Sequence, residues 1–552
     1  MSPCLVLGPL LRYTGATDAT VWVETDAACE VSVTVDGSTH RARTFSVESH
    51  HYGLVRISDL RPGSSYEYSV ELDGERVWPD PSYDFPPPRI RTISSDDSLS
   101  LAFGSCRVSV PHEPPYTLNK DEDERGHGQD ALYALALRTQ SEPPDRWPDA
   151  LLLLGDQVYA DEVSPGALEF IRSRRDTGKG PGEEVADFEE YTRLYWDSWK
   201  DPVIRWLLST VPSAMIFDDH DVHDDWNTSE AWSKSMRGEP WWEERIVGAF
   251  MSYWVYQHLG NLSPKELEED DLFGKVREAE DATRVLREFG HKAHREAAGA
   301  RWSYHRDFGG VRLIVMDTRA GRVLKEGHRS MLGAEEWAWI EDTATGDFDH
   351  LLFGASLPFL MAPGLHHLEA WNEAVCAGAW GRAAARLGER FRQLVDLEHW
   401  AAFQRSFHSL AELLRSIASG ERSNSRAPAS VILLSGDVHH GYLAEADFGD
   451  GARSPVYQAV SSPMRNLLGR PERLGLRAGW TKPGELVGKT LARLAGVEPP
   501  SVRWSLDHKE PWFDNHVSTL ELHGRRASLK VSKAAGDAGE PSLSTILERR
   551  LA

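Results

Sequence analysis

The sequence predicts two parts, an all-β domain over residues 1–92 and an α/β domain over residues 99–535. In the first part, apolar and polar side chains alternate with a period of two, which is typical of half-buried strands. In the second part, short continuous apolar runs end in Gly, Ser, Asp or His, and helical patterns separate them. Such runs indicate strands buried on both faces, as in a sheet flanked by helices.

The first domain contains three alternating segments, ATVWVE (19–24), CEVSVTV (29–35) and YEYSVEL (66–72), with polar turns between them. A Pro-Gly turn in LRPGSSYEYSVELDG (60–74) lies directly before the Tyr-rich strand. This pattern resembles a fibronectin-type-III or immunoglobulin-like sandwich. The Pro-rich stretch WPDPSYDFPPPR (78–89) is typical of a linker to the next domain.

The second domain has six apolar runs with polar ends: LAFGSC (101–106), ALLLLGD (150–156), SAMIFDDHD (213–221), VRLIVMD (311–317), HLLFGAS (350–356) and SVILLSGDVHH (430–440). In an open α/β sheet the carboxyl ends of the strands form the ligand crevice, so we expect these polar residues to converge. The longest helical insertions span about 230–300 and 363–428, and 515–533 has the pattern of a two-stranded ribbon.

Composition limits the partners and the compartment. The 552 residues carry a formal charge of −24, which argues against nucleic acid or an anionic membrane as the main partner. The four cysteines form no CxxC pair, which favours a reducing compartment. The first residues lack a basic region and a twin Arg, and no apolar run reaches the ~18 residues that span a bilayer. We therefore expect a cytoplasmic protein without a membrane span; its oligomeric state cannot be inferred.

Three residues at the first strand ends have the chemistry of metal ligands. A carboxylate at Asp156, on the turn after a buried strand, can bridge two cations, and Tyr159 reaches the same place one turn later. A Tyr ligand favours a hard ion such as ferric iron over magnesium. Cys106 ends the first strand, where nearby cations lower a thiol pKa. The alternatives are a polar loop after a strand and a small buried cysteine.

Two later strand ends add further candidates. Asp437 and His439 are two residues apart in SGDVHHG, so both can face one centre. In DDHDVHDDWN (218–227), Asp219 and His220 fall where the strand meets its loop, and Asp221 can support them from behind. Asn227 begins NTSE, so it is either a helix N-cap or a carbonyl-oxygen ligand. Asp224 and Asp225 are either solvated or helix-capping residues.

Four ordered motifs resemble the PhoD-like (alkaline phosphatase D) family of calcineurin-like metallophosphoesterases: GSC at 104–106, GDQVYADE at 155–162, DDHD at 218–221 and GDVH at 436–439. MDTR (316–319), SSPMRN (461–466) and PWFDN (511–515) are further similarities, and the likeness covers essentially the whole chain. The resemblance implies a metallophosphoesterase sandwich of mixed sheets flanked by helices, preceded by the β-sandwich.

The family pattern, carried over residue by residue, implies a binuclear or multinuclear metal centre. Asp156 would bridge the metals and act in catalysis. A first site, for Fe(3+), would use Cys106, Tyr159 and His439. A second site, for Ca(2+) or another divalent ion, would use Asp219 and Asp437.

The same carry-over gives two residues a role toward the substrate. His220 would face the phosphate and protonate the leaving oxygen, and Arg107 would contact phosphate oxygens. Related enzymes have a His-Pro strand end where this chain has Ser356, which implies an oxygen-rich second site. His366 and His367 open a helical region and are not expected to replace that imidazole.

The resemblance implies hydrolysis of phosphate esters by a bridging hydroxide held between two metal ions. The substrate would be a phosphate-ester small molecule or a phosphodiester, because monoesters and diesters use the same metal pair. Specific nucleic-acid recognition is not expected. The alternative is a non-catalytic, metal-dependent binding protein that presents a partner or polysaccharide through its β-sandwich.

Overall fold

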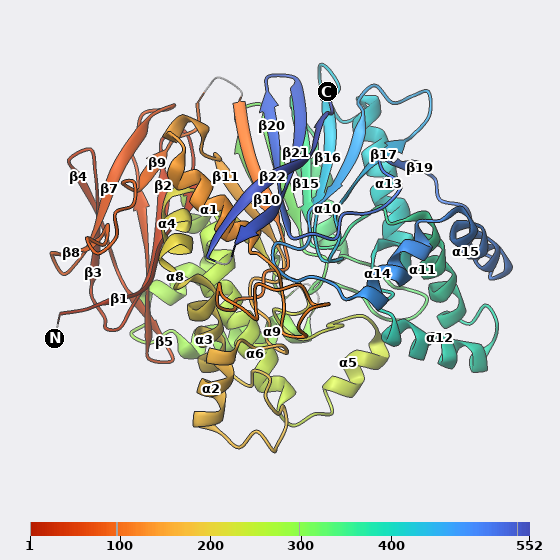
Figure 1. The fold of residues 1–552 in the computed structure, drawn as a ribbon, viewed down its shortest axis with the longest axis horizontal. Helices are drawn as coiled ribbons and strands as arrows, with labels where there is room; N and C mark the ends of the chain where they lie inside the picture. The colour runs from red at the N-terminus through yellow and green to blue at the C-terminus, as the bar shows by residue number, and fades with distance from the viewer. Residues whose placement is uncertain (1, 95–97, 297–298, 538) are drawn as a thin grey trace.

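The structure, a computed structural model, describes residues 2–94, 98–296, 299–537 and 539–552 (Figure 1). An all-β region at the N-terminus is followed by two mixed sheets with helices around them. This arrangement confirms the predicted fold class.

The N-terminal region consists of two antiparallel sheets, with the strand orders β1-β2-β6-β5 and β4-β3-β7-β8, and β9 paired to β7. Its strands are β1 (Leu5–Thr14), β2 (Ala19–Thr25), β3 (Glu30–Val35), β4 (Ser38–Arg43), β5 (Phe45–Val47), β6 (His50–Ile57), β7 (Ser65–Leu72), β8 (Glu75–Trp78) and β9 (Arg89–Arg91). Alternate residues of β7 are buried, as the period of two predicts, and the buried sides of both sheets share one apolar core.

Two further sheets build the rest of the chain, with the orders β12-β11-β10-β20-β21-β22 and β13-β14-β15-β16-β18-β17-β19. Their strands are β10 (Ser98–Gly104), β11 (Ala150–Leu154), β12 (Ser213–Ile216), β13 (Tyr304–Phe308), β14 (Val311–Met316), β15 (His350–Ala355), β16 (Ser430–Ser435), β17 (Tyr442–Asp447), β18 (Val456–Val460), β19 (Arg503–Leu506), β20 (His516–His523), β21 (Arg526–Asp537) and β22 (Glu540–Arg550). The six predicted apolar runs form β10, β11, β12, β14, β15 and β16. Strands β10–β12, and strands β14, β15, β16 and β18, are parallel. The C-terminal ribbon has a third strand, β22, which lies beyond the predicted limit at residue 535.

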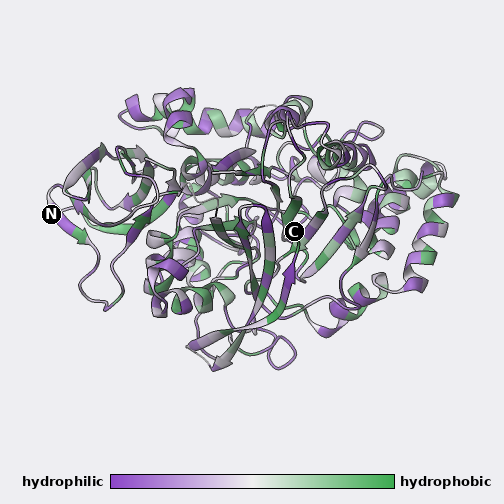
Figure 2. Cartoon of the chain, turned by 90° about the horizontal axis from the view of Figure 1, so that it is seen from above, coloured by the Kyte–Doolittle hydropathy of each residue, from purple (hydrophilic) through white to green (hydrophobic). Residues whose placement is uncertain are grey.

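Helices cover the sheets and form the predicted insertions: α1 (Ala131–Ser141), α2 (Pro165–Arg174), α3 (Phe188–Trp199), α4 (Pro202–Thr210), α5 (Glu230–Met236), α6 (Trp242–Ser252), α7 (Pro264–Glu269), α8 (Asp271–Glu278), α9 (Thr283–Arg295), α10 (Ala334–Thr343), α11 (Pro363–Cys376), α12 (Arg382–Leu394), α13 (Gln404–Ser419), α14 (Arg470–Gly479) and α15 (Lys482–Leu494). Hydrophobic residues concentrate in the central strands, and hydrophilic residues on the outer helices (Figure 2). Gly354 of β15 has no side chain, and a Cβ there would lie 3.4 Å from Leu152 and Leu154 of the facing sheet. The two sheets therefore pack closely, and the ends of their parallel strands come together.

Polar contacts join the N-terminal sheets to the rest of the molecule. The buried guanidinium of Arg12 donates to the carbonyl oxygens of Ser213, Tyr256 and Gln257, at 3.2, 2.6 and 2.7 Å. His50 lies between two carboxylates, with Nδ1 3.0 Å from Glu24 and Nε2 2.8 Å from Glu189 of α3. These contacts hold β1 and β6 against the helices around the strand ends.

Candidate metal centre

Four of the predicted ligands meet beside the ends of β10, β11 and β16. The donor atoms of Cys106, Asp156 and His439 lie within 4.8 Å of one another. The hydroxyl of Tyr159 lies 3.5 Å from Asp156 Oδ2 and accepts from the Asn466 amide at 3.2 Å. Thiol, phenol, imidazole and carboxylate together form a donor set suited to a transition-metal ion.

The backbone is bent sharply at these strand ends. Cys106, Asp156, Asp437 and His439 have φ values of 55°, 49°, 66° and 50°. Non-glycine residues rarely adopt positive φ, which costs of order 1–3 kcal/mol each and is concentrated at functional sites. The bends turn all four side chains toward one place.

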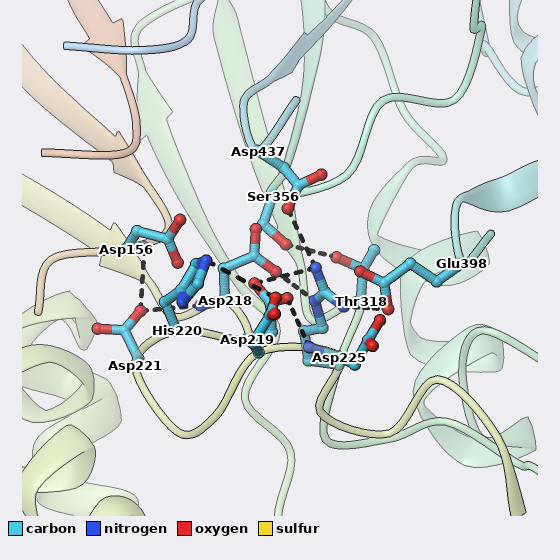
Figure 3. Close-up of polar contacts among 12 residues, drawn as sticks. Asp156, Asp218, Asp219, His220, Asp221, Asp225, Thr318, Ser356, Glu398 and Asp437 are labelled. Atoms are coloured by element: carbon cyan, nitrogen blue, oxygen red, sulfur yellow. Dashed lines mark hydrogen bonds and ion pairs between the residues drawn. The ribbon is translucent and has the colours of Figure 1, made fainter. Parts of the chain in front are cut away.

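A second group of carboxylates lies next to the first. The donor oxygens of Asp156, Asp218 and Asp219 are within 4.8 Å of one another, and so are those of Asp219, Glu398 and Asp437 (Figure 3). Asp156 and Asp219 come from different strand ends, as expected. Sequence reasoning missed Glu398, which comes from the insertion after α12.

Arg319 is a buried cation among these carboxylates. Its Nη2 lies 3.2 Å from Asp219 Oδ1 and 3.1 Å from Asp437 Oδ1, and its guanidinium also pairs closely with Asp218 and Glu398. Burial alone would raise the pKa of Glu398, but the nearby guanidinium of Arg319 lowers it to about 2. Arg319 follows the end of β14 within the MDTR motif, but its place in the site was not predicted.

His220 is oriented by a carboxylate that was also missed. Its Nδ1 lies 2.9 and 3.0 Å from the two oxygens of Asp161, and its Nε2 points away from that pair, 3.8 Å from Asp224. Burial alone would lower the pKa of His220, but Asp161 and then Asp219 raise it well above its usual value. Asp161 therefore orients the ring and favours the protonated imidazole next to the cluster.

Asp221 ties two ligand loops together. Its carboxylate accepts from the backbone N–H groups of Asp156, Val158 and Asp218, at 3.1, 3.3 and 2.9 Å. Burial raises the pKa of Asp221 to about 7. Its oxygens are thus occupied by the backbone, behind the donors that face the centre (Figure 3).

His399 contacts the centre from the insertion that supplies Glu398. Its Nδ1 lies 2.7 Å from Glu369, and its Nε2 lies 3.2 Å from Asp437 Oδ2. At the expected His-Pro strand end, Ser356 instead pairs its hydroxyl with that of Thr318 at 2.9 Å. His366, which precedes His367, packs against Phe407 and Trp504. It therefore does not replace the imidazole of the expected His-Pro strand end.

The structure places Arg107 in a buried ion pair. Its Nη2 lies 2.8 Å from Asp130, and its Nη1 donates to the Ser198 carbonyl at 3.0 Å. Arg107 is only 6% exposed, and Asp130 has a pKa lowered to about 2 because Arg107 and Arg465 outweigh its burial. Asp130 thus balances the charge of Arg107, whereas Arg319 is the arginine that lies among the carboxylates of the centre.

The structure corrects one reading of Asn227, the helix N-cap. The N-cap of α5 is Ser229, whose hydroxyl accepts from Trp232 N at 3.1 Å. Asn227 Nδ2 donates to the Arg319 carbonyl at 3.2 Å, and its Oδ1 accepts from Ser233 at 3.4 Å. Through these two hydrogen bonds Asn227 joins its own loop to the loop of Arg319 and to α5.

The electrostatics of the cluster fit bound cations. Burial, and then the charges of Asp156 and Asp437, raise the pKa of the Cys106 thiol. Burial, and then the charge of His220, lower the pKa of His439 to about 3, so its imidazole is neutral. Burial and then the neighbouring carboxylates Asp219, Asp221 and Asp437 raise the pKa of Asp156, against the effect of His220. Among the described residues, no hydrogen-bond donor reaches the buried Asp156 Oδ1. A metal ion would satisfy this oxygen and offset the excess negative charge.

Two packed mixed sheets with this donor set at their strand ends define a metallophosphoesterase. A family profile of PhoD-like phosphatases matches residues 132–467, and a family described as a domain of unknown function (DUF7800) matches residues 2–90. The chain belongs to the PhoD-like phosphatase family and is a phosphoester hydrolase.

One solved structure agrees with this fold, and a second shows a weaker similarity. A structure of PhoD has a TM-score of 0.60 and 11% identity, covering 100% of this chain and 92% of the other. A purple acid phosphatase from yellow lupin (Lupinus luteus) seeds has a TM-score of 0.48 and 10% identity, covering 99% and 74%. A search of curated proteins found no match. No helix in the described ranges is long and apolar enough to cross a membrane.

Proposed function

We propose that this hydrolase cleaves phosphate monoesters or diesters with a multinuclear metal centre at the strand ends. Cys106, Asp156, Tyr159 and His439 would hold the first ion, with Fe(3+) as the expected species. Asp156, Asp219 and Asp437, joined by Glu398, would hold Ca(2+) or another divalent ion. The observation that carries the proposal is the convergence of thiol, phenol, neutral imidazole and carboxylates around the unsatisfied Asp156 Oδ1.

Bound metal ions would supply a hydroxide held between them and neutralise phosphate charge. His220 would donate the Nε2 proton to the leaving oxygen, because Asp161 holds Nδ1 and favours the imidazolium. Arg319 would offset part of the negative charge of Asp218, Asp219, Glu398 and Asp437 and hold these carboxylates in place. Positioning and charge neutralisation are most of what phosphoryl transfer requires.

The binding-protein alternative is set aside, because the chain belongs to a phosphatase family. Three expectations stay predictions: the domain limits 1–92 and 99–535, the choice between monoester and diester, and the cytoplasmic location inferred from cysteine spacing.

The decisive experiment is Asp156→Ala, assayed on p-nitrophenyl phosphate and its bis ester, with elemental analysis of the same sample. We expect loss of activity together with loss of metal. Asp176→Ala is the matched control, because Asp176 lies on an exposed loop beside Lys179. Wild-type activity in Asp156→Ala would contradict the proposal, and iron without calcium would correct the second ion.

A further inference from the structure

Large hydrophobic side chains are exposed mainly in one lobe of the molecule. This lobe consists of α11, α12, α14 and α15, which lie together at one end (Figure 1). Of the nine large hydrophobic residues exposed in the described part of the chain, all but Tyr83 belong to it: Trp380, Leu387, Leu394, Val395, Leu474, Leu486, Val487 and Leu494. Leu394 is 78% exposed, and Leu486 and Leu494 are each 67% exposed. Isolated exposed leucines are ordinary, but such concentration on one lobe marks an interaction surface.

Contacts connect the exposed residues of neighbouring helices. The Trp380 indole donates to the Leu494 carbonyl at the end of α15, at 3.1 Å. Trp371 of α11 lies 5.6 Å from Trp380 and 6.1 Å from Phe391 of α12, measured between ring centroids. The exposed side chains of α12 and α15 therefore flank a shared aromatic cluster.

The same helices reverse the charge of the molecule. Helices α11, α12, α14 and α15 contain ten Lys and Arg against five Glu, a formal charge of +5. Since the whole chain carries −24, the remainder carries −29. The total charge of −24, which argues against an anionic membrane as a partner, therefore hides a positive charge on this lobe.

Each of α12 and α15 buries one side and exposes the other. Gly388 of α12 lies against Cys376 and Val375 of α11, and Gly488 of α15 lies against the backbone of α11. On the outer side, Arg386, Leu387, Arg390 and Leu394 of α12 recur at helical spacing. Leucine interleaved with arginine on an exposed helix is the pattern of helices that lie in a membrane interface.

We propose that this lobe docks on an anionic lipid surface, with the leucines inserted between headgroups and the Lys and Arg residues contacting lipid phosphates. The charge complementarity favours a lipid surface over a second copy in a twofold dimer, because such a dimer would place +5 against +5. The docked protein would present its hydrolytic centre to substrates at that surface. The insertion supports this link, because Glu398 follows α12 after only a short turn.

The test is flotation of the full-length protein with vesicles of phosphatidylcholine alone or with about 30% phosphatidylserine. We expect binding to the anionic vesicles, and loss of binding at high salt, because each Lys or Arg near such a surface contributes about fivefold. Leu486→Glu combined with Leu494→Glu should reduce partitioning by more than about tenfold. Arg386→Glu combined with Arg390→Glu should reduce it by a similar factor.

Matched controls use residues outside the lobe. Tyr83→Glu removes the exposed aromatic of the Pro-rich segment, and Arg76→Glu reverses an exposed charge on β8, so neither should alter flotation. Unchanged hydrolysis of p-nitrophenyl phosphate would show that the lobe variants fold. If the wild-type protein does not float with the vesicles, the proposed hydrolytic function is unaffected. Absence of binding, equal binding to both vesicle types, or a dimer in sedimentation that Leu486→Glu with Leu494→Glu dissolves would each overturn the lipid assignment.

Discussion

His50 joins the N-terminal sheets to α3 with a charge that depends on pH. Both of its ring nitrogens face carboxylates, Glu24 at 3.0 Å and Glu189 at 2.8 Å. Burial alone would lower the pKa of His50, but hydrogen bonds to Glu189 and Glu24 raise it from 6.5 to about 9. Folding therefore favours the protonated imidazole.

The sign and size of the effect follow from that shift. Because the folded pKa lies above the unfolded one, the stabilisation is fully present below pH 6.5 and is lost as pH rises through about 9. A difference of about 2.5 pH units corresponds to about 3 kcal/mol. For a chain of this length, that free energy moves the melting temperature by about 2–3 °C.

His50→Gln keeps two hydrogen-bonding groups but removes the charge, and calorimetry can follow its melting temperature. We expect the variant to melt about 2–3 °C below wild type at about pH 6.5 and within about 0.5 °C of it at about pH 10. His51→Gln is the control, since burial lowers the pKa of His51 and its effect should not fade between these two conditions. An equal deficit of His50→Gln at both conditions would refute the assigned imidazolium.

Asp161→Asn should lower kcat by about 10²–10⁴-fold, because it removes the charge that favours the imidazolium of His220; wild-type kcat would exclude His220 as the acid. Arg107→Ala should destabilise the protein by about 3–5 kcal/mol by leaving the buried Asp130 without its nearest cation, and melting curves with KM measured in parallel check this. A raised KM with unchanged melting would restore Arg107 as a phosphate contact. Removing metal with a chelator should lower the melting temperature, because the carboxylates around Asp156 then repel one another. Recovery of the melting temperature when metal is added back checks reversibility. An unchanged melting temperature on chelation would exclude a metal that stabilises the fold.

Residues at strand ends could be predicted, because local pattern decides where a buried strand stops. Cys106, Asp156, Asp219 and His439 each follow a continuous apolar run, and parallel strands bring such ends to one edge. The fold class followed from the same runs together with the period of two near the N-terminus.

Residues brought in by insertions could not be predicted from these patterns. Glu398 and His399 lie between helices of an insertion, and nothing in their neighbours indicates that the segment returns to the strand ends. Asp161 lies within the GDQVYADE motif, but its pairing with His220 depends on how the loops after β11 and β12 meet in the fold. Arg107 and Arg319 both lie beside strand ends in the sequence. Only the fold shows that Arg107 pairs with Asp130, away from the centre, and that Arg319 pairs with Asp219 within it.

The place of β10 in its sheet has a consequence for synthesis of the protein. β10 pairs with β11 on one side and with β20 on the other, and the loop with Cys106 begins where β10 ends. At ~5–20 residues per second, a ribosome needs roughly 20–80 s to go from β10 to β20. During that time the nascent chain has an open strand edge that other chains can pair with. The sheet that carries Cys106 and Asp156 is completed only after translation has passed β20, so the strand ends of this sheet reach their final positions late in synthesis.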